Sequence, residues 1–212
     1  MIRDSNLDYQ WKKEYLPWTQ FSGTLKLEAG TPNKLISTKA TADAPEVAVV
    51  GSTGINAVVM NPGGTGEVVE TIWVPSSEID WEHDVHLRVA YSTDQTTADS
   101  VVWKIHYEKL TAPAAIPATV DDALDTVIAS DSASTTANAF QYSPVGQINA
   151  LTVTTNDADT LLALQVELDN YGGSNGAVSF HGVHVAYVPR LTQRHANNEP
   201  PIDAANPFTS SI

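Results

Sequence analysis

The chain has 212 residues, no cysteine, and 25 acidic against 11 basic side chains, which gives a net charge of −14. Without cysteine it has no disulfide, zinc–thiolate site or cysteine nucleophile. A protein this acidic repels phosphate, which argues against a nucleic-acid partner. The length suits one all-β domain that buries about 70% of its unfolded surface.

The charge is uneven along the chain. Residues 1–39 carry +2, residues 40–189 carry −16, and residues 190–212 are neutral overall. An acidic body beside a less acidic end suits a protein that docks by that end. The N-terminal segment has no apolar core like that of a signal peptide, and no run approaches 18 apolar residues. We therefore expect neither a signal peptide nor a membrane partner.

Residues 1–20 lack a regular alternation and are predicted to form an N-terminal arm. Five of the 16 aromatic side chains lie within the first 21 residues. Aromatic side chains bury large apolar areas and are enriched at interfaces. The candidate partner-binding residues are Tyr9, Trp11, Tyr15 and Trp18. Two interpretations stay open: the arm docks on a neighbouring subunit, or these residues cover the open end of their own sandwich.

From residue 21 onward, apolar and polar residues alternate with a period of two. The clearest runs are 21–29, 85–91, 101–107 and 162–168. Each run has one apolar face and one polar face, which is typical of antiparallel strands with one buried side. Trp103 and Leu164 lie on the inward phase of their runs. Further strands are predicted at 35–39, 46–50, 55–60, 67–74, 125–129, 147–155 and 177–188.

The last predicted strand contains a change of phase. Phe180 belongs to one phase and Val183 to the other, with Gly182 at the switch, so we expect a β-bulge there. The strand count and the long connections predict an all-β fold, an antiparallel β-sandwich of jelly-roll type with extended N- and C-terminal arms. The predicted domains are the arm 1–20, the sandwich 21–189 and an extended tail 190–212.

The densest polar cluster lies between residues 78 and 86. Asp80, Glu82 and Asp84 stand at a spacing of two and could offer oxygen ligands to calcium. The cluster lacks the glycine and the terminal glutamate of a calcium-binding helix-loop-helix. We interpret it as a solvated loop and predict no metal site.

The histidines also fail to form a metal-ligand pattern. His83 and His86 are three residues apart, as are His181 and His184. In a regular strand this spacing sends the two side chains to opposite faces, so neither pair is predicted to bind a metal together. No nucleophile elbow or phosphate-binding loop is present. We therefore predict no catalytic residue and no cofactor.

Three tryptophans raise the possibility of a sugar-stacking platform. Trp103 lies on an inward phase and Trp73 at a strand end, so both are predicted to be packed. Trp81 is the one expected to be exposed.

Two blocks of the chain resemble a known family. The first joins residues 72–75, 80–92 and 101–107, and the second joins residues 159–169 and 178–187. Over residues 66–188 this succession of strands and loops is similar to the jelly-roll auxiliary proteins of tailed-bacteriophage heads, called cement or decoration proteins. The resemblance implies a homotrimer on the outer surface of the head, bridging subunits of the major capsid protein, with no catalytic residues. It also implies synthesis in the host cytoplasm and location in the virion.

The leading hypothesis is therefore a non-enzymatic capsid cement protein. The alternative is a phage appendage or receptor-binding module of the same fold that recognises host glycans, and a third hypothesis is a calcium-dependent carbohydrate-binding module. Truncating residues 1–20 should abolish capsid binding under the first hypothesis and leave glycan binding intact under the second.

Overall fold

A computed structural model describes the chain in ten segments. These are residues 11–21, 45–50, 54–60, 67–74, 79–81, 83–111, 125–128, 131–149, 160–172 and 176–189. Within them the regular structure is twelve strands and one 3₁₀ turn, with no α-helix. Consequently no helix in the described segments is long and apolar enough to cross a membrane.

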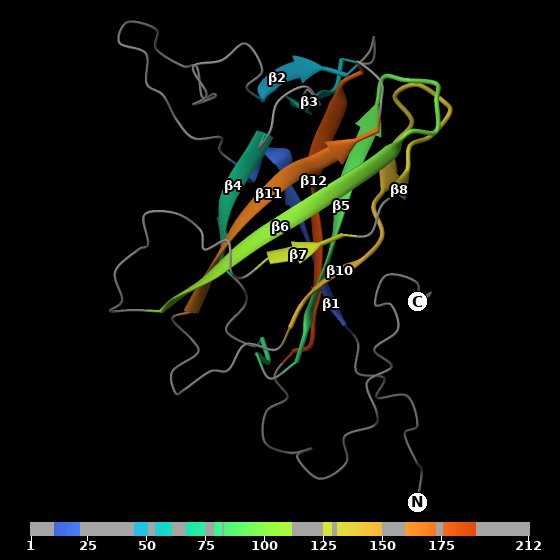
Figure 1. Cartoon of the computed structure of the whole chain (residues 1–212). Coiled ribbons are helices and arrows are strands. Elements are labelled where there is room, and N and C mark those ends of the chain that lie inside the picture. The colour runs from blue at the N-terminus through green and yellow to red at the C-terminus, as the bar shows by residue number, and fades with distance from the viewer. Residues whose placement is uncertain are drawn as a thin grey trace, which may run out of the picture.

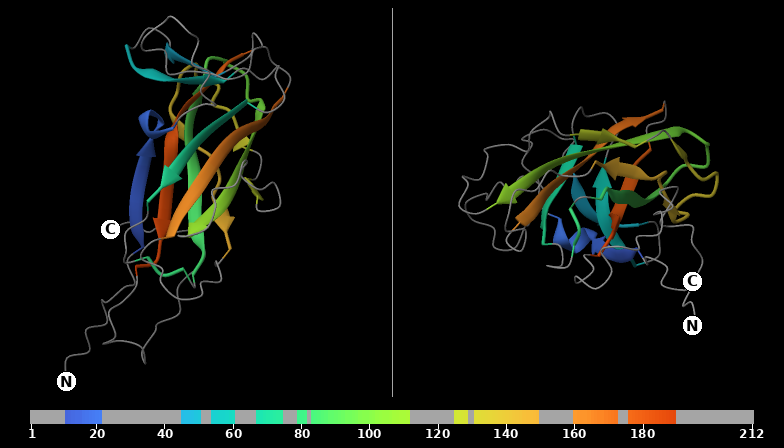
Figure 2. Two further views of the ribbon diagram at one scale, coloured as in Figure 1. Left: turned by 90° about the vertical axis from the view of Figure 1, so that its left-hand side faces the viewer. Right: turned by 90° about the horizontal axis from the view of Figure 1, so that it is seen from below.

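The strands pair into two antiparallel sheets that pack face to face (Figures 1 and 2). Sheet A contains β1 (Lys12–Pro17), β2 (Glu46–Val49), β3 (Asn56–Met60), β5 (Val85–Thr93), β9 (Gln141–Tyr142), β10 (Gly146–Ile148) and β12 (Val178–Tyr187). Sheet B contains β4 (Glu67–Trp73), β6 (Ser100–Thr111), β7 (Asp125–Val127), β8 (Asp131–Ser132) and β11 (Thr160–Tyr171). The 3₁₀ turn η1 (Trp18–Gln20) follows β1.

The strand order confirms the predicted jelly roll. Sheet A has the order β10-β5-β12-β3-β2, and sheet B has the order β4-β11-β6-β7. If β3, β4, β5, β6, β7, β10, β11 and β12 are taken as the first to eighth strands, the sheets read 6-3-8-1 and 2-7-4-5. This is the arrangement of two Greek keys that defines a jelly roll.

The core lies between the sheets and contains the inward side chains that alternation predicts. Trp103, Ile105 and Leu164 are fully buried, as are the inward residues of β5 and β12. The predicted strands at 46–50, 55–60, 67–74 and 125–129 correspond to β2, β3, β4 and β7. Residues 22–29, 35–39 and 151–155, also predicted as strand, lie outside the described segments.

The predicted start of the sandwich at residue 21 falls too late. Residues 12–17, placed in the arm by the sequence, form β1 and pair in register with β12, from Lys12 opposite Tyr187 to Pro17 opposite Gly182. Figure 2 shows β1 running beside β12 at the side of the sandwich. Residues 1–10 of the predicted arm and the whole predicted tail 190–212 lie outside the described segments.

Candidate functional site

The outer surface of sheet A carries aromatic, histidine and basic side chains, and we call it face A. Its side chains come from β1, β5, β9 and β12 and the residues beside them, which strand pairing places next to one another. Tyr15 and Phe140 have 43% and 54% of their surface exposed. The members of face A are Trp11, Lys13, Tyr15, His86, Arg88, Phe140, Tyr142, His181 and His184.

Face A depends on β1, and one half-buried carboxylate attaches β1 to both sheets. Glu14 Oε2 accepts a hydrogen bond from Trp73 Nε1 in sheet B at 3.0 Å. Glu14 Oε1 accepts another from the Tyr187 hydroxyl in sheet A at 2.6 Å. Because successive residues of a strand point to opposite sides, this inward Glu14 directs Tyr15 outward. The Tyr15 hydroxyl then donates to the carbonyl of His181 at 2.8 Å.

Three side chains form a row across face A. Tyr15, His184 and Arg88 are direct partners in the registers of β1, β12 and β5. The Tyr15 and His184 ring centroids lie 4.7 Å apart in an edge-on contact. The Arg88 guanidinium carbon lies 3.8 Å from the centroid of Tyr142, whose ring is 4.9 Å from that of His184. Ring–ring and cation–ring contacts of this kind are each worth about 0.5–1.5 kcal/mol, so they hold the row in one arrangement.

The predicted bulge at Gly182 is confirmed, and it changes which face the histidines occupy. The register of β12 against β5 shifts between Phe180 and Gly182. Gly182 has φ +149°, and a Cβ atom there would clash with the Leu16 carbonyl oxygen. The extra residue reverses the alternation once, so His181 and His184 share face A. The expectation that they point to opposite faces is wrong for this reason.

A second aromatic group extends face A beyond the row. The Phe140 ring centroid lies 5.0 Å from that of Tyr142 and 5.4 Å from that of His181. His181 Nε2 is 2.9 Å from Ser92 Oγ, which fixes the imidazole. At the other end of the face, the Trp11 ring stands edge-on to His86 at 4.9 Å.

Burial sets the charge state of the histidines on face A. Burial lowers the pKa of His86, His181 and His184, and the cations Arg88 and Lys13 lower the pKa of His184 further. On His86, Asp84 acts in the opposite direction but is the smaller effect. At neutral pH the imidazoles are therefore neutral, and Arg88 and Lys13 supply the positive charge.

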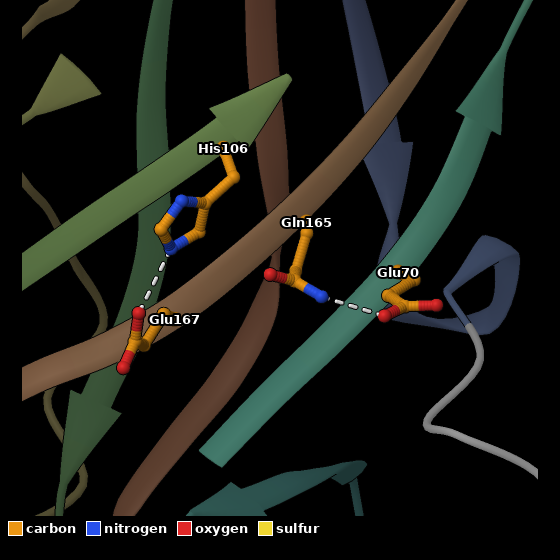
Figure 3. Close-up of polar contacts among 4 residues, drawn as sticks. All are labelled: Glu70, His106, Gln165 and Glu167. Carbon is orange, nitrogen blue, oxygen red and sulfur yellow. Dashed lines mark hydrogen bonds and ion pairs between the residues drawn. The ribbon is translucent and has the colours of Figure 1, made fainter. Parts of the chain in front are cut away.

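The outer surface of sheet B, which we call face B, has the opposite character. Figure 3 shows two polar contacts on it, which link β4, β11 and β6. Gln165 Nε2 donates to Glu70 Oε1 at 2.6 Å, and His106 Nε2 lies 2.9 Å from Glu167 Oε2. His106 is almost completely buried, with 4% of its side chain exposed. The members of face B are Glu70, Ile72, Lys104, His106, Glu108, Gln165 and Glu167.

The predicted partner-binding residues divide into two groups. Trp11 and Tyr15 lie on face A, whereas Trp18 packs against the hydrophobic core. Tyr9 lies outside the described segments. The structure thus brings together two of the four, and adds Arg88, Phe140, Tyr142 and the histidines, which the sequence analysis did not select.

The three tryptophans considered for sugar stacking are all buried. Trp81, expected to be exposed, has 2% of its surface exposed and lies 6.4 Å from Trp73 between ring centroids. Although Trp81 precedes β5 in a turn, the isolated bridge of Ile79 to Pro189 draws this turn against the sandwich. A platform built from Trp73, Trp81 and Trp103 is therefore ruled out.

The acidic loop before β5 forms no ligand cluster among the residues that the structure describes. His83 Nε2 lies 3.6 Å from Asp80 Oδ2, and the described segments hold no group of three or more metal-ligating side chains. Glu82 lies outside these segments.

No family model and no curated protein matches this chain. Among solved structures, a conserved carbohydrate esterase of the Shiga toxin-encoding bacteriophage phi24B is similar at 14% identity and a TM-score of 0.32, covering 69% of this chain and 88% of its own. A carbohydrate-binding module specific for non-crystalline cellulose is similar at 11% identity and a TM-score of 0.26, covering 69% of this chain and 78% of its own. At these values neither protein indicates what this chain binds.

Proposed function

We propose that this chain is a non-enzymatic virion structural protein, a cement protein that binds the outer surface of a phage head and bridges major capsid subunits as a homotrimer. The observation that carries the proposal is the composition of face A. Its tyrosine, tryptophan and arginine are the residue types enriched at the centres of protein interfaces, and charged acidic residues are depleted there. Face A is therefore the docking surface for a protein partner.

The rigidity of the jelly roll supports this role. Face A rests on strands whose opposite sides form the core, so its rings are held before any partner arrives. A preorganised surface loses less entropy on binding. Many copies on a shell then add weak contacts into strong attachment.

The test combines mass measurement with co-sedimentation on preformed capsids. We expect a trimer that sediments with capsids, and we expect Phe140→Ala and Arg88→Glu to weaken sedimentation while both variants remain folded by circular dichroism. The matched control is Ile72→Ala, an exposed apolar residue of face B at 53% exposure. A wild-type protein that stays in the supernatant, or face A variants that sediment like the wild type, would refute the proposal.

The alternative, a receptor-binding module for host glycans, is favoured by one observation. Tyr15 and Phe140 expose rings on the same face, and sugars stack on such rings. Glycan binding that is lost in Phe140→Ala, without capsid binding, would select this alternative.

A further inference from the structure

Face A and face B differ in the sign of their charge. The outward side chains of β1, β5, β9, β10 and β12 include no Asp or Glu, although the whole chain has 25 acidic residues. Asp84, directly before β5, lies at the end of this face, where its carboxylate accepts a hydrogen bond from Gln147. Arg88 is one of three basic residues between positions 40 and 189 and stands in the central row of this face. Face B instead carries Glu70, Glu108 and Glu167 against Lys104.

The charges of the two faces are far enough apart to act on a partner separately. Packed sheets lie about 10 Å apart, and the outward side chains add to this separation. At physiological ionic strength charges are screened over about 8 Å. A partner on face A therefore meets Arg88 and Lys13 more strongly than the acids of face B.

We propose that face A recognises a carboxylate-rich protein surface, with Arg88 as the central charged contact and Lys13 in support. This inference rests on the proposed function only for the identity of the partner. Arginine binds carboxylates through two parallel hydrogen bonds, and its stacking on Tyr142 at 3.8 Å holds the guanidinium in place. The aromatic side chains around it, Trp11, Tyr15 and Phe140, supply the apolar area of the contact.

A second copy of this chain is a poorer partner for face A than a different protein is, although the face B of that copy is acidic. The two faces lie on opposite sides of one sandwich (Figure 2). Pairing face A of one copy with face B of the next would place copies in a row that does not close, and non-closing contacts produce open filaments. A closed trimer needs another surface, which leaves face A for a different protein.

The experiment measures binding of a fluorescein-labelled decaglutamate peptide by fluorescence anisotropy at 0.15 M salt. We expect Arg88→Gln to weaken binding about tenfold, equivalent to about 1.4 kcal/mol, and Lys13→Gln to weaken it roughly threefold. Lys104→Gln, which removes an outward cation from face B, is the matched control and should bind like the wild type. Because Lys13 is exposed and outside the core, its variant keeps the test valid if Arg88→Gln is unstable.

Each outcome has a defined meaning. No binding of decaglutamate, or binding that Lys104→Gln reduces as much as Arg88→Gln, would overturn the inference. Binding of an oligogalacturonate without decaglutamate binding would also overturn it and point to a carboxylated glycan. Capsid binding without decaglutamate binding would refute this inference alone, whereas Arg88-dependent peptide binding without capsid binding would refute the proposed function alone.

Discussion

Face A and face B belong to one sandwich, yet they differ in almost every property that matters for recognition. Face A has exposed rings, one arginine in a central row and no outward acid on β1, β5, β9, β10 or β12. Face B carries glutamates that are hydrogen-bonded to neighbours on adjacent strands (Figure 3). Because alternation gives each strand one inward and one outward side, two sheets can share a core and still carry different outer surfaces.

The largest expected effect comes from changes to the core that supports both faces. Trp103 is fully buried on β6 and contacts Tyr91 and Phe180 of the opposite sheet, with ring centroids 5.7 and 6.1 Å apart. We expect Trp103→Ala to lower the free energy of unfolding by about 3–5 kcal/mol, and Leu164→Ala by about 2–5 kcal/mol. Urea denaturation followed by circular dichroism checks this. Wild-type midpoints in both variants would show that the assigned core is wrong.

The second-largest effect on stability should be confined to β1 and the part of face A beside it. We expect Gly182→Val to lower the free energy of unfolding by about 1–3 kcal/mol, because φ +149° and the Leu16 carbonyl both oppose a side chain. Hydrogen exchange measured by NMR should show lost protection in β1 and retained protection in β11. Unchanged exchange in β1 would contradict the assigned role of the bulge.

Glu14→Ala should separate the attachment of β1 from the rest of the fold. It leaves Trp73 Nε1 and the Tyr187 hydroxyl without their acceptor, which typically costs about 1–3 kcal/mol. Limited proteolysis should cleave between residues 11 and 21 faster than in the wild type. Glu14→Gln, which keeps one acceptor oxygen, is the control and should be cleaved more slowly than Glu14→Ala.

Acidification should weaken the fold through face A. The folded-state pKa values of His86, His181 and His184 lie below the ordinary histidine value of 6.5. Below about pH 6.5 the unfolded chain therefore binds more protons than the folded protein, and stability falls as pH falls. Melting temperatures between pH 7.5 and 5 measure this. The triple variant with glutamine at all three positions should show a flatter profile; an equally steep profile would locate the effect elsewhere.

The smallest effect should be on face B. Ile72→Lys replaces an exposed residue of β4, so we expect a change in stability within about 0.5 kcal/mol and no change in partner binding. A loss of binding comparable to Phe140→Ala would remove the distinction between the faces.

The alternation of apolar residues predicted β5, β6 and β11 and their buried sides, because period two follows directly from strand geometry. It missed β1, whose inward positions hold Lys12 and Glu14 before Leu16. A half-buried carboxylate with two specific donors has no signature in local sequence. Face A was missed for a similar reason: its row joins Tyr15 to His184 across most of the chain.

The bulge was predicted at Gly182, but its effect on the neighbouring histidines was not carried through. Counting alternation across an extra residue would have placed His181 and His184 together. The absence of acids on the outward phases of β5 and β12 is a further signal that the sequence contained.

The central place of β12 in sheet A has a consequence for how the protein is made. β12 is the last described strand in the chain, yet β1, β3 and β5 all pair with it. During synthesis these three strands cannot pair with β12 until about residue 187 has left the ribosome. Folds dominated by such distant pairings form slowly. Sheet A, and face A with it, therefore assembles only after β12 has been synthesised.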